Sequence, residues 1–181
     1  LSGNLFAAGF DGVDAEVGLE SRYFLESGLN GQNKYHPSLS AELETAYRLK
    51  DDDFQLKLFA RYDDQDTQRS HFDVREASWI HIGDAWELKA GVSKVFWGVT
   101  ESRHLVDVIN QSDTVENIDG EDKLGQVMTK FSFEQEWGTV DAFWLPYFRE
   151  RTFPGKKGRL LALPLIVDTD AAEYESSAEQ W

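Results

Sequence analysis

Charged side chains of both signs alternate with apolar ones along several segments, and they are the residues best placed to do chemistry. In a water-filled passage such charges set a local field that sorts ions and solutes. Opposite charges on neighbouring strands would also pair across the wall. The solvated face of a soluble sheet shows the same alternation. The candidate wall residues are Arg22, Glu42, Glu44, Arg48, Lys57, Arg61 and Lys89.

A second group of candidates lies in the stretch 98–125. This stretch is too rich in apolar residues for a loose external loop, and loops of such length are usually functional or disordered. We expect it to fold inward and narrow a pore, and an ordered cap on the rim is the alternative. The residues that would face the constriction are Arg103, His104, Asp107, Asp113, Glu116 and Asp119.

Other chemistries have weaker support. The four histidines show no zinc-binding spacing. The acids between Asp113 and Asp122 do not follow a calcium-loop pattern, so a solvated acidic loop is favoured. Ser102 and His104 lack a nucleophile-elbow sequence, and Glu42 with Glu44 fits a charge ladder better than a glycosidase pair. We therefore predict no enzyme activity, no metal and no cofactor.

Strict alternation of apolar and polar residues identifies the elements that must position these groups. The clearest case runs from Leu39 to Leu49, where all odd positions except Thr45 are apolar and all positions between them except Ala46 are polar. The segment 73–82 is ambiguous, because both of its faces mix charged and apolar residues. The predicted strands are 14–24, 38–49, 54–62, 73–82, 86–97, 126–135 and 138–148.

The connections between these strands alternate between short turns and long loops. Segregation of loop length by end is typical of outer-membrane barrels, with turns in the periplasm and loops outside. Tyr23 and Tyr62 end strands at the long-loop side, and Tyr47 and Trp86 lie beside short turns. We interpret them as two interfacial girdles, although aromatic residues are common in any strand.

The overall composition narrows the function classes. The net charge of −15 argues against a nucleic-acid partner. The chain has no cysteine, which rules out a disulfide framework. The longest apolar run, Leu160–Val167, is far shorter than a membrane helix.

A resemblance to a known class rests on this pattern and on one loop. The stretch Phe96-Trp97-Gly98, followed by His104-Leu105-Val106-Asp107 and Asn110-Gln111, resembles an uncharacterised family of proteobacterial outer-membrane proteins. The whole pattern looks like Gram-negative porins, whose third outer loop folds into the lumen. The resemblance implies a larger barrel of which this chain is the N-terminal part, and it carries over no binding residues.

We therefore predict an all-β fold, an antiparallel transmembrane β-barrel of meander topology, forming a single domain over 1–181 or its N-terminal portion. Seven strands is an odd number, so we expect the barrel to be incomplete in this chain. The predicted function is passive diffusion of small hydrophilic solutes or ions across the bacterial outer membrane. The alternatives are a plugged barrel that serves as an anchor or assembly partner, and a soluble antiparallel domain that binds carbohydrate. The expected partners are outer-membrane lipid and small solutes, and the sequence leaves a homo-oligomer or larger assembly open.

Overall fold

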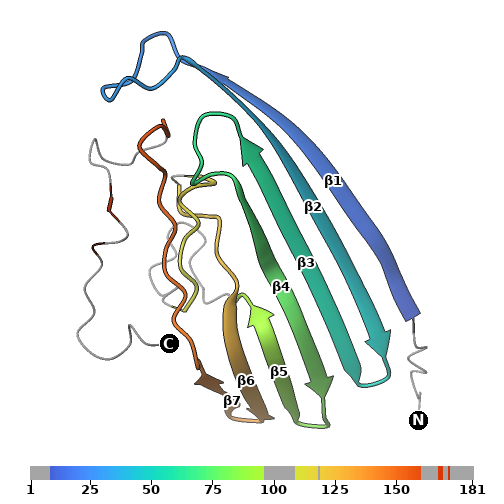
Figure 1. The fold of residues 1–181 in the computed structure, drawn as a ribbon. Coiled ribbons are helices and arrows are strands. Elements are labelled where there is room, and N and C mark those ends of the chain that lie inside the picture. Colours follow the sequence, from blue (N-terminus) through green and yellow to red (C-terminus); the bar gives the residue numbers. More distant parts are fainter. Residues whose placement is uncertain (1–8, 96–108, 118, 160–166, 169–170, 172–181) are drawn as a thin grey trace.

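The computed structural model describes residues 9–95, 109–117, 119–159, 167–168 and 171. Its seven strands are β1 (Gly9–Tyr23), β2 (Tyr35–Leu49), β3 (Asp52–Asp63), β4 (His71–Ile82), β5 (Trp86–Ser93), β6 (Gln126–Gln135) and β7 (Gly138–Trp144). Each strand pairs antiparallel with the next one in the chain, so the sheet order is β1 to β7 (Figure 1). The predicted all-β antiparallel meander is confirmed.

The sheet is not closed into a barrel. A barrel requires its first and last strands to pair, and β1 and β7 instead form the two edges of the described sheet. Figure 1 shows them at opposite ends of a curved surface. The described residues thus form an open antiparallel sheet, and the predicted barrel closure is not shown by them.

Two strands end four residues earlier than predicted, for different physical reasons. β5 stops at Ser93 rather than 97, because the Asn110 side chain takes over the backbone partners there. Its amide nitrogen donates to the Ser93 carbonyl (3.0 Å), and its oxygen accepts from the Val95 amide (2.8 Å). β7 stops at Trp144 rather than 148, because Pro146 has no N–H to donate to a ladder.

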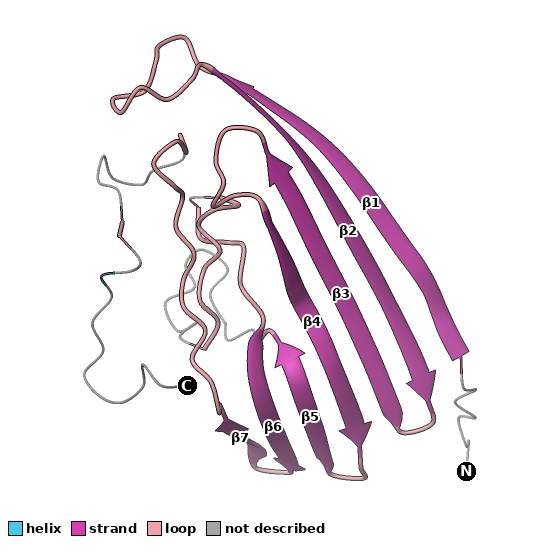
Figure 2. Cartoon of the chain, viewed as in Figure 1, coloured by secondary structure: helices cyan, strands magenta, loops and turns pink. Residues whose placement is uncertain are grey.

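Loop length segregates by end, as predicted. The short connections β2–β3, β4–β5 and β6–β7 lie at one end of the sheet, and the β1–β2 and β3–β4 loops lie at the other (Figure 2). The β2–β3 turn has two residues between the paired Leu49 and Asp52, and Lys50 takes a positive φ of 51°. Tight hairpins of this length need such a residue, because their twist matches that of the strands.

Register aligns the two kinds of side chain on opposite faces of the sheet. Leu43 of β2 pairs with Ala15 and Leu58, whereas Glu44 pairs with Asp14 and Lys57. We call the inner face the one that carries the charged positions and against which the segments 109–117 and 145–159 pack. The outer face is the opposite, apolar one.

β4 departs from strict alternation through a bulge. Lys57 pairs with Glu76 but Leu58 pairs with Val74, so Arg75 is an extra residue. A bulge turns consecutive side chains toward the same face, and Arg75 and Glu76 both make ion pairs on the inner face. This explains why the alternation within 73–82 is ambiguous in the sequence.

Burial is distributed in the opposite sense to a soluble domain. Among the described residues, the buried apolar side chains are Val115, Leu124 and Met128, and the other buried side chains are polar or charged. The outer face meanwhile leaves Val17 73% and Leu19 83% exposed. The interior of the described structure is thus held mainly by polar contacts.

Candidate functional site

The half of the inner face nearest the long loops carries a network of buried ion pairs between the sheet and the segment 109–117. Arg75, placed inward by the β4 bulge, is buried, and its Nη2 lies 2.7 Å from Oδ2 of Asp113, whose side chain is 0% exposed. The other oxygen of Asp113 accepts a hydrogen bond of 2.6 Å from the Thr152 hydroxyl. The guanidinium of Arg75 also stacks 4.6 Å from the centre of the Phe59 ring.

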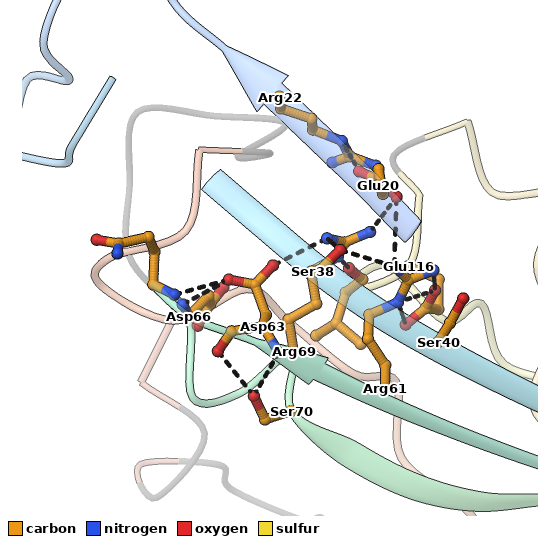
Figure 3. A network of polar contacts seen from close by, with 12 residues as sticks. Glu20, Arg22, Ser38, Ser40, Arg61, Asp63, Asp66, Arg69, Ser70 and Glu116 are labelled. Carbon is orange, nitrogen blue, oxygen red and sulfur yellow. Dashed lines mark hydrogen bonds and ion pairs between the residues drawn. The ribbon is translucent and has the colours of Figure 1, made fainter. Parts of the chain in front are cut away.

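Arg61 of β3 binds the same segment, 109–117, at Glu116. Its Nε donates to both oxygens of Glu116 (2.9 and 2.8 Å), and its Nη2 lies 2.7 Å from Oε2. Arg61 Nη1 reaches Glu20 of β1 (3.3 Å) and the Ser38 hydroxyl of β2 (3.0 Å). One guanidinium therefore ties three strands to the docked segment (Figure 3).

Arg69, in the β3–β4 loop, completes this network. It pairs with Asp63 (2.9 Å) and Glu20 (3.0 Å) and donates to the Val115 carbonyl (3.0 Å). Burial lowers the pKa of Arg69, but the hydrogen bonds to Asp63 and Glu20 outweigh burial and raise it. The guanidinium of Arg69 is always positively charged. Its ion pairs with Asp63 and Glu20 therefore require no change in the protonation of the arginine.

A second segment, 145–159, docks over the first. Arg149 pairs with Asp73 of β4 and donates to the Gly125 carbonyl (2.9 Å). The Gly155 amide donates to both oxygens of buried Asp66 (3.1 and 3.0 Å). Burial raises the pKa of Asp66, and the backbone hydrogen bonds from Gly155 and Gln68 oppose this.

Gly155 fits this contact because it lacks a side chain. A Cβ at this position would lie 2.5 Å from Asp66 Oδ1, well inside van der Waals contact. The absence of a side chain therefore lets the backbone amide approach the carboxylate directly.

The short-turn half of the inner face is open, and its charges pair along the wall. Lys57 lies between Glu42 (2.7 Å) and Glu44 (2.9 Å) of the neighbouring strand. Lys89 pairs with Glu76 at 2.9 Å across β4 and β5. Arg48 pairs with Asp53, Lys130 with Asp141, and the Glu44 side chain is 58% exposed. The predicted cross-strand ladders are present in this half.

Lys94, just after β5, lies between the two halves. Burial lowers its pKa, and the neighbouring charges of Arg75 and Lys57 lower it further. Nearby Asp122 and Glu76 act in the opposite direction. Three positively charged side chains, Lys94, Arg75 and Lys57, therefore lie near one another at the boundary between the open and the docked half.

The predicted site residues fall into three groups. All those on strands lie on the inner face: Arg22, Glu42, Glu44, Arg48, Lys57, Arg61 and Lys89. Asp113 and Glu116 meet the sheet through arginines, whereas Asp119 is exposed and accepts from Asn117 (2.6 Å). Arg103, His104 and Asp107 lie outside the described residues.

Sequence reasoning missed several members of the network, namely Asp63, Asp66, Arg69, Asp73, Arg75, Asn110 and Arg149. Arg75 was hidden by the bulge, since its position breaks the period of two. Arg69 and Arg149 are in loops, where no local sequence pattern indicates that a charged side chain will be buried. The adjacent Arg75-Glu76 in a strand pattern was the one available signal of a bulge.

Metal binding by the acidic loop receives no geometric support. Within the described ranges, no group of three His, Asp or Glu side chains is arranged to hold a metal ion. Asp113 and Glu116, candidates for calcium ligands, are engaged by Arg75 and Arg61 instead. Glu42 and Glu44 share Lys57, as a charge ladder would.

The outer face carries aromatic rings near both ends of the strands. Tyr47, Phe54 and Trp79 are register neighbours at the short-turn end. The row continues through ring contacts from Trp79 to His81 (6.1 Å), from His81 to Trp86 (5.2 Å) and from Trp86 to Phe131 (6.0 Å). The predicted girdle positions Tyr47 and Trp86 both belong to this row.

The long-loop end has its own ring cluster. Tyr23 pairs with Tyr35, and Tyr62 and Phe72 lie at the same end of β3 and β4. All four side chains are more than half exposed. At about 3.4 Å per residue, β3 covers about 27 Å between Phe54 and Tyr62.

Comparison with known proteins leaves the chain without a family assignment. No protein-family model, curated protein or solved structure matches it. The resemblance of the loop motif to outer-membrane proteins therefore stays a prediction. Separately, no helix among the described residues is both long enough and apolar enough to cross a bilayer.

Proposed function

We propose that this sheet is part of the wall of an outer-membrane β-barrel channel for passive diffusion of small hydrophilic solutes or ions. The observation that carries the proposal is the inverted distribution of side chains. The broad face of the sheet that no described segment covers is the apolar one, and the covered face is charged. A soluble sheet hides its apolar face, whereas a membrane barrel offers that face to lipid.

The spacing of the aromatic rows supports this placement. The two rows are about 27 Å apart along β3, and Tyr35 and Tyr47 are about 41 Å apart along β2. With a tilt of roughly 40°, these lengths correspond to about 20–30 Å across a bilayer, which matches the apolar band of such barrels. Val17, Leu39 and Leu43 lie between the rows.

The open edges require a further element. Unpaired backbone groups in hydrocarbon cost several kcal/mol each, so β1 and β7 need strand partners before the sheet can sit in lipid. The proposal therefore includes additional strands that pair with both edges and close the wall.

The choice of a channel over a plugged barrel rests on the open half of the inner face. The docked segments cover the long-loop half, where Arg75 and Asp113 are buried. The short-turn half keeps Glu44 and Arg48 exposed at 58% and 47%. Docking would thus narrow the passage at one level and leave the rest lined with water-accessible charge.

The test is the single-channel conductance of the full-length protein in a planar bilayer, with a salt gradient across it. Stable ohmic steps support the channel, and the reversal potential reports its ion preference. Insertion without conductance would overturn the channel and favour the plugged barrel. A protein that stays monomeric in buffer and does not insert would overturn the barrel itself and favour the soluble β-domain.

A further inference from the structure

His71, the first residue of β4, has a ring nitrogen in an unusual position. Its Nδ1 lies 3.0 Å from the Arg69 carbonyl oxygen. A carbonyl oxygen only accepts hydrogen bonds, so Nδ1 carries the hydrogen, and Nε2 of the neutral ring is an unprotonated lone pair. Nε2 is buried and makes no hydrogen bond with any described residue.

The lone pair of Nε2 faces two carboxylates of the docked segment. It lies 3.9 Å from Asp113 Oδ2 and 3.8 Å from Glu116 Oε1. A lone pair opposite two negative oxygens contributes nothing to docking. An N–H at the same place would give charge-assisted attraction to both of them.

The other charged groups around this ring are held in ion pairs of their own. Arg61, the register partner of His71 on β3, pairs with Glu116, and Arg75 on β4 pairs with Asp113. From the β3–β4 loop, Arg69 presents its carbonyl to the ring, and Asp73 on β4 is itself paired with Arg149. The Phe59 ring, 5.7 Å away, is the apolar neighbour.

Histidine is the side chain that takes up a proton between about pH 8 and pH 5. The His71 side chain is 21% exposed, so the ring borders solvent although Nε2 itself is buried. We propose that His71 is a proton-sensitive latch: protonation of Nε2 at acidic pH pairs it with Asp113 and Glu116 and tightens the docking of 109–117 on the inner face. In the channel this narrows the passage at acidic pH, a consequence that rests on the proposed function.

The test measures docking directly. The chain has no cysteine, so nitroxide labels on Asp84→Cys, in the β4–β5 turn, and Glu121→Cys, shortly after the docked segment 109–117, report one distance without background. Both positions are exposed. Pulsed electron resonance on the full-length protein in micelles or nanodiscs gives the docked and undocked shares at pH 8 and pH 5.5.

We expect the ratio of docked to undocked protein to rise about tenfold on acidification, the low end for hydrogen bonds to charged groups. His71→Asn keeps a donor toward the Arg69 carbonyl and should hold the pH 8 ratio at both pH values. His71→Gln places a permanent N–H near Nε2 and should hold a higher ratio at both. The matched control is His81→Asn on the outer face, where His81 pairs with Asp52 (2.8 Å), and it should respond like the wild type.

The latch would be overturned if the ratio of docked to undocked wild-type protein is the same at pH 8 and pH 5.5. This outcome is read on the wild type alone, so it does not depend on any His71 variant folding. A full pH response in His71→Asn would also overturn the latch, because it would assign the titration to another group such as Asp66. Conductance without a pH-dependent distance removes the latch and leaves the channel. A pH-dependent distance without conductance leaves the latch and removes the channel.

Discussion

Leu43→Arg tests whether the outer face lies in lipid. Leu43 is on β2 between the two aromatic rows, four residues from Tyr47, which is about 14 Å along the strand. Its neighbours on the outer face are Ala15 and Leu58. At the tilt of such barrels this depth is about 10 Å inside the short-turn row, close to the middle of the apolar band.

The magnitude follows from that depth. Arginine near the bilayer midplane costs a barrel about 2–4 kcal/mol, which lowers the ratio of folded to unfolded protein about 30- to 900-fold. If the same face were bathed in water, Leu43, which is 36% exposed, would tolerate the change to within about 0.5 kcal/mol. The two environments thus predict effects that differ several-fold.

The assay is reversible urea unfolding of the full-length protein from lipid vesicles, followed by Trp fluorescence. The control is Gln55→Arg on the inner face of β3, opposite Ala46 and Ser78, which should cost under about 1 kcal/mol because water reaches that side. Equal effects of the two substitutions, or an effect of Leu43→Arg below 0.5 kcal/mol, would refute the assignment of faces.

Three further predictions concern the inner face. Arg75→Met leaves Asp113 buried without its cation and should cost about 3–5 kcal/mol in urea unfolding, and Arg75→Met combined with Asp113→Leu should recover most of it; no recovery would contradict the pairing. Lys57→Gln removes one positive charge from the open half of the inner face. With the axis of the proposed channel taken as about 10 Å away, that charge is worth about 0.4 kcal/mol for a monovalent ion in water. Cation permeability, read from the reversal potential, should then rise about twofold, and an unchanged permeability ratio would place Lys57 outside the conduction path. Because burial raises the pKa of Asp66, its contribution to the stability of the folded chain is present at low pH and lost as the pH rises from 3.8 through the raised pKa. The free energy of urea unfolding should therefore fall across that window more steeply in the wild type than in Asp66→Asn, and identical pH profiles would contradict the role of Asp66.

The strands could be predicted because their information is local. Alternation over ten or so residues, as from Leu39 to Leu49, identifies both the strand and its apolar side, and the hairpin pairing follows from the short turns. The ambiguity at 73–82 has an equally local cause, since one inserted residue at Arg75 exchanges the faces of everything beyond it. A bulge has no fixed sequence signature, so alternation alone could not locate it.

The docked network could not be predicted in the same way. Arg61 and Glu116 are 55 residues apart, and Asp66 and Gly155 are 89 apart. Their pairing depends on how two long segments fold back over the sheet, and no spacing within either segment encodes it. The inward fold of 98–125 was inferred from composition, and the described segment 109–117 contacts the inner face through Asp113 and Glu116.

The use of ion pairs rather than apolar contacts at this interface bears on how the docked segment works. Buried ion pairs contribute little net stability, because desolvation offsets most of their attraction. An apolar interface of the same shape would hold the segment at least as firmly, but on release it would expose apolar surface to water. Arg61 and Arg75 on the sheet, with Glu116 and Asp113 on the segment, can instead separate into water and be solvated as ions. In the proposed channel this interface would suit a segment that docks and undocks, and the proposed proton on His71 is the kind of small added attraction that would shift its position.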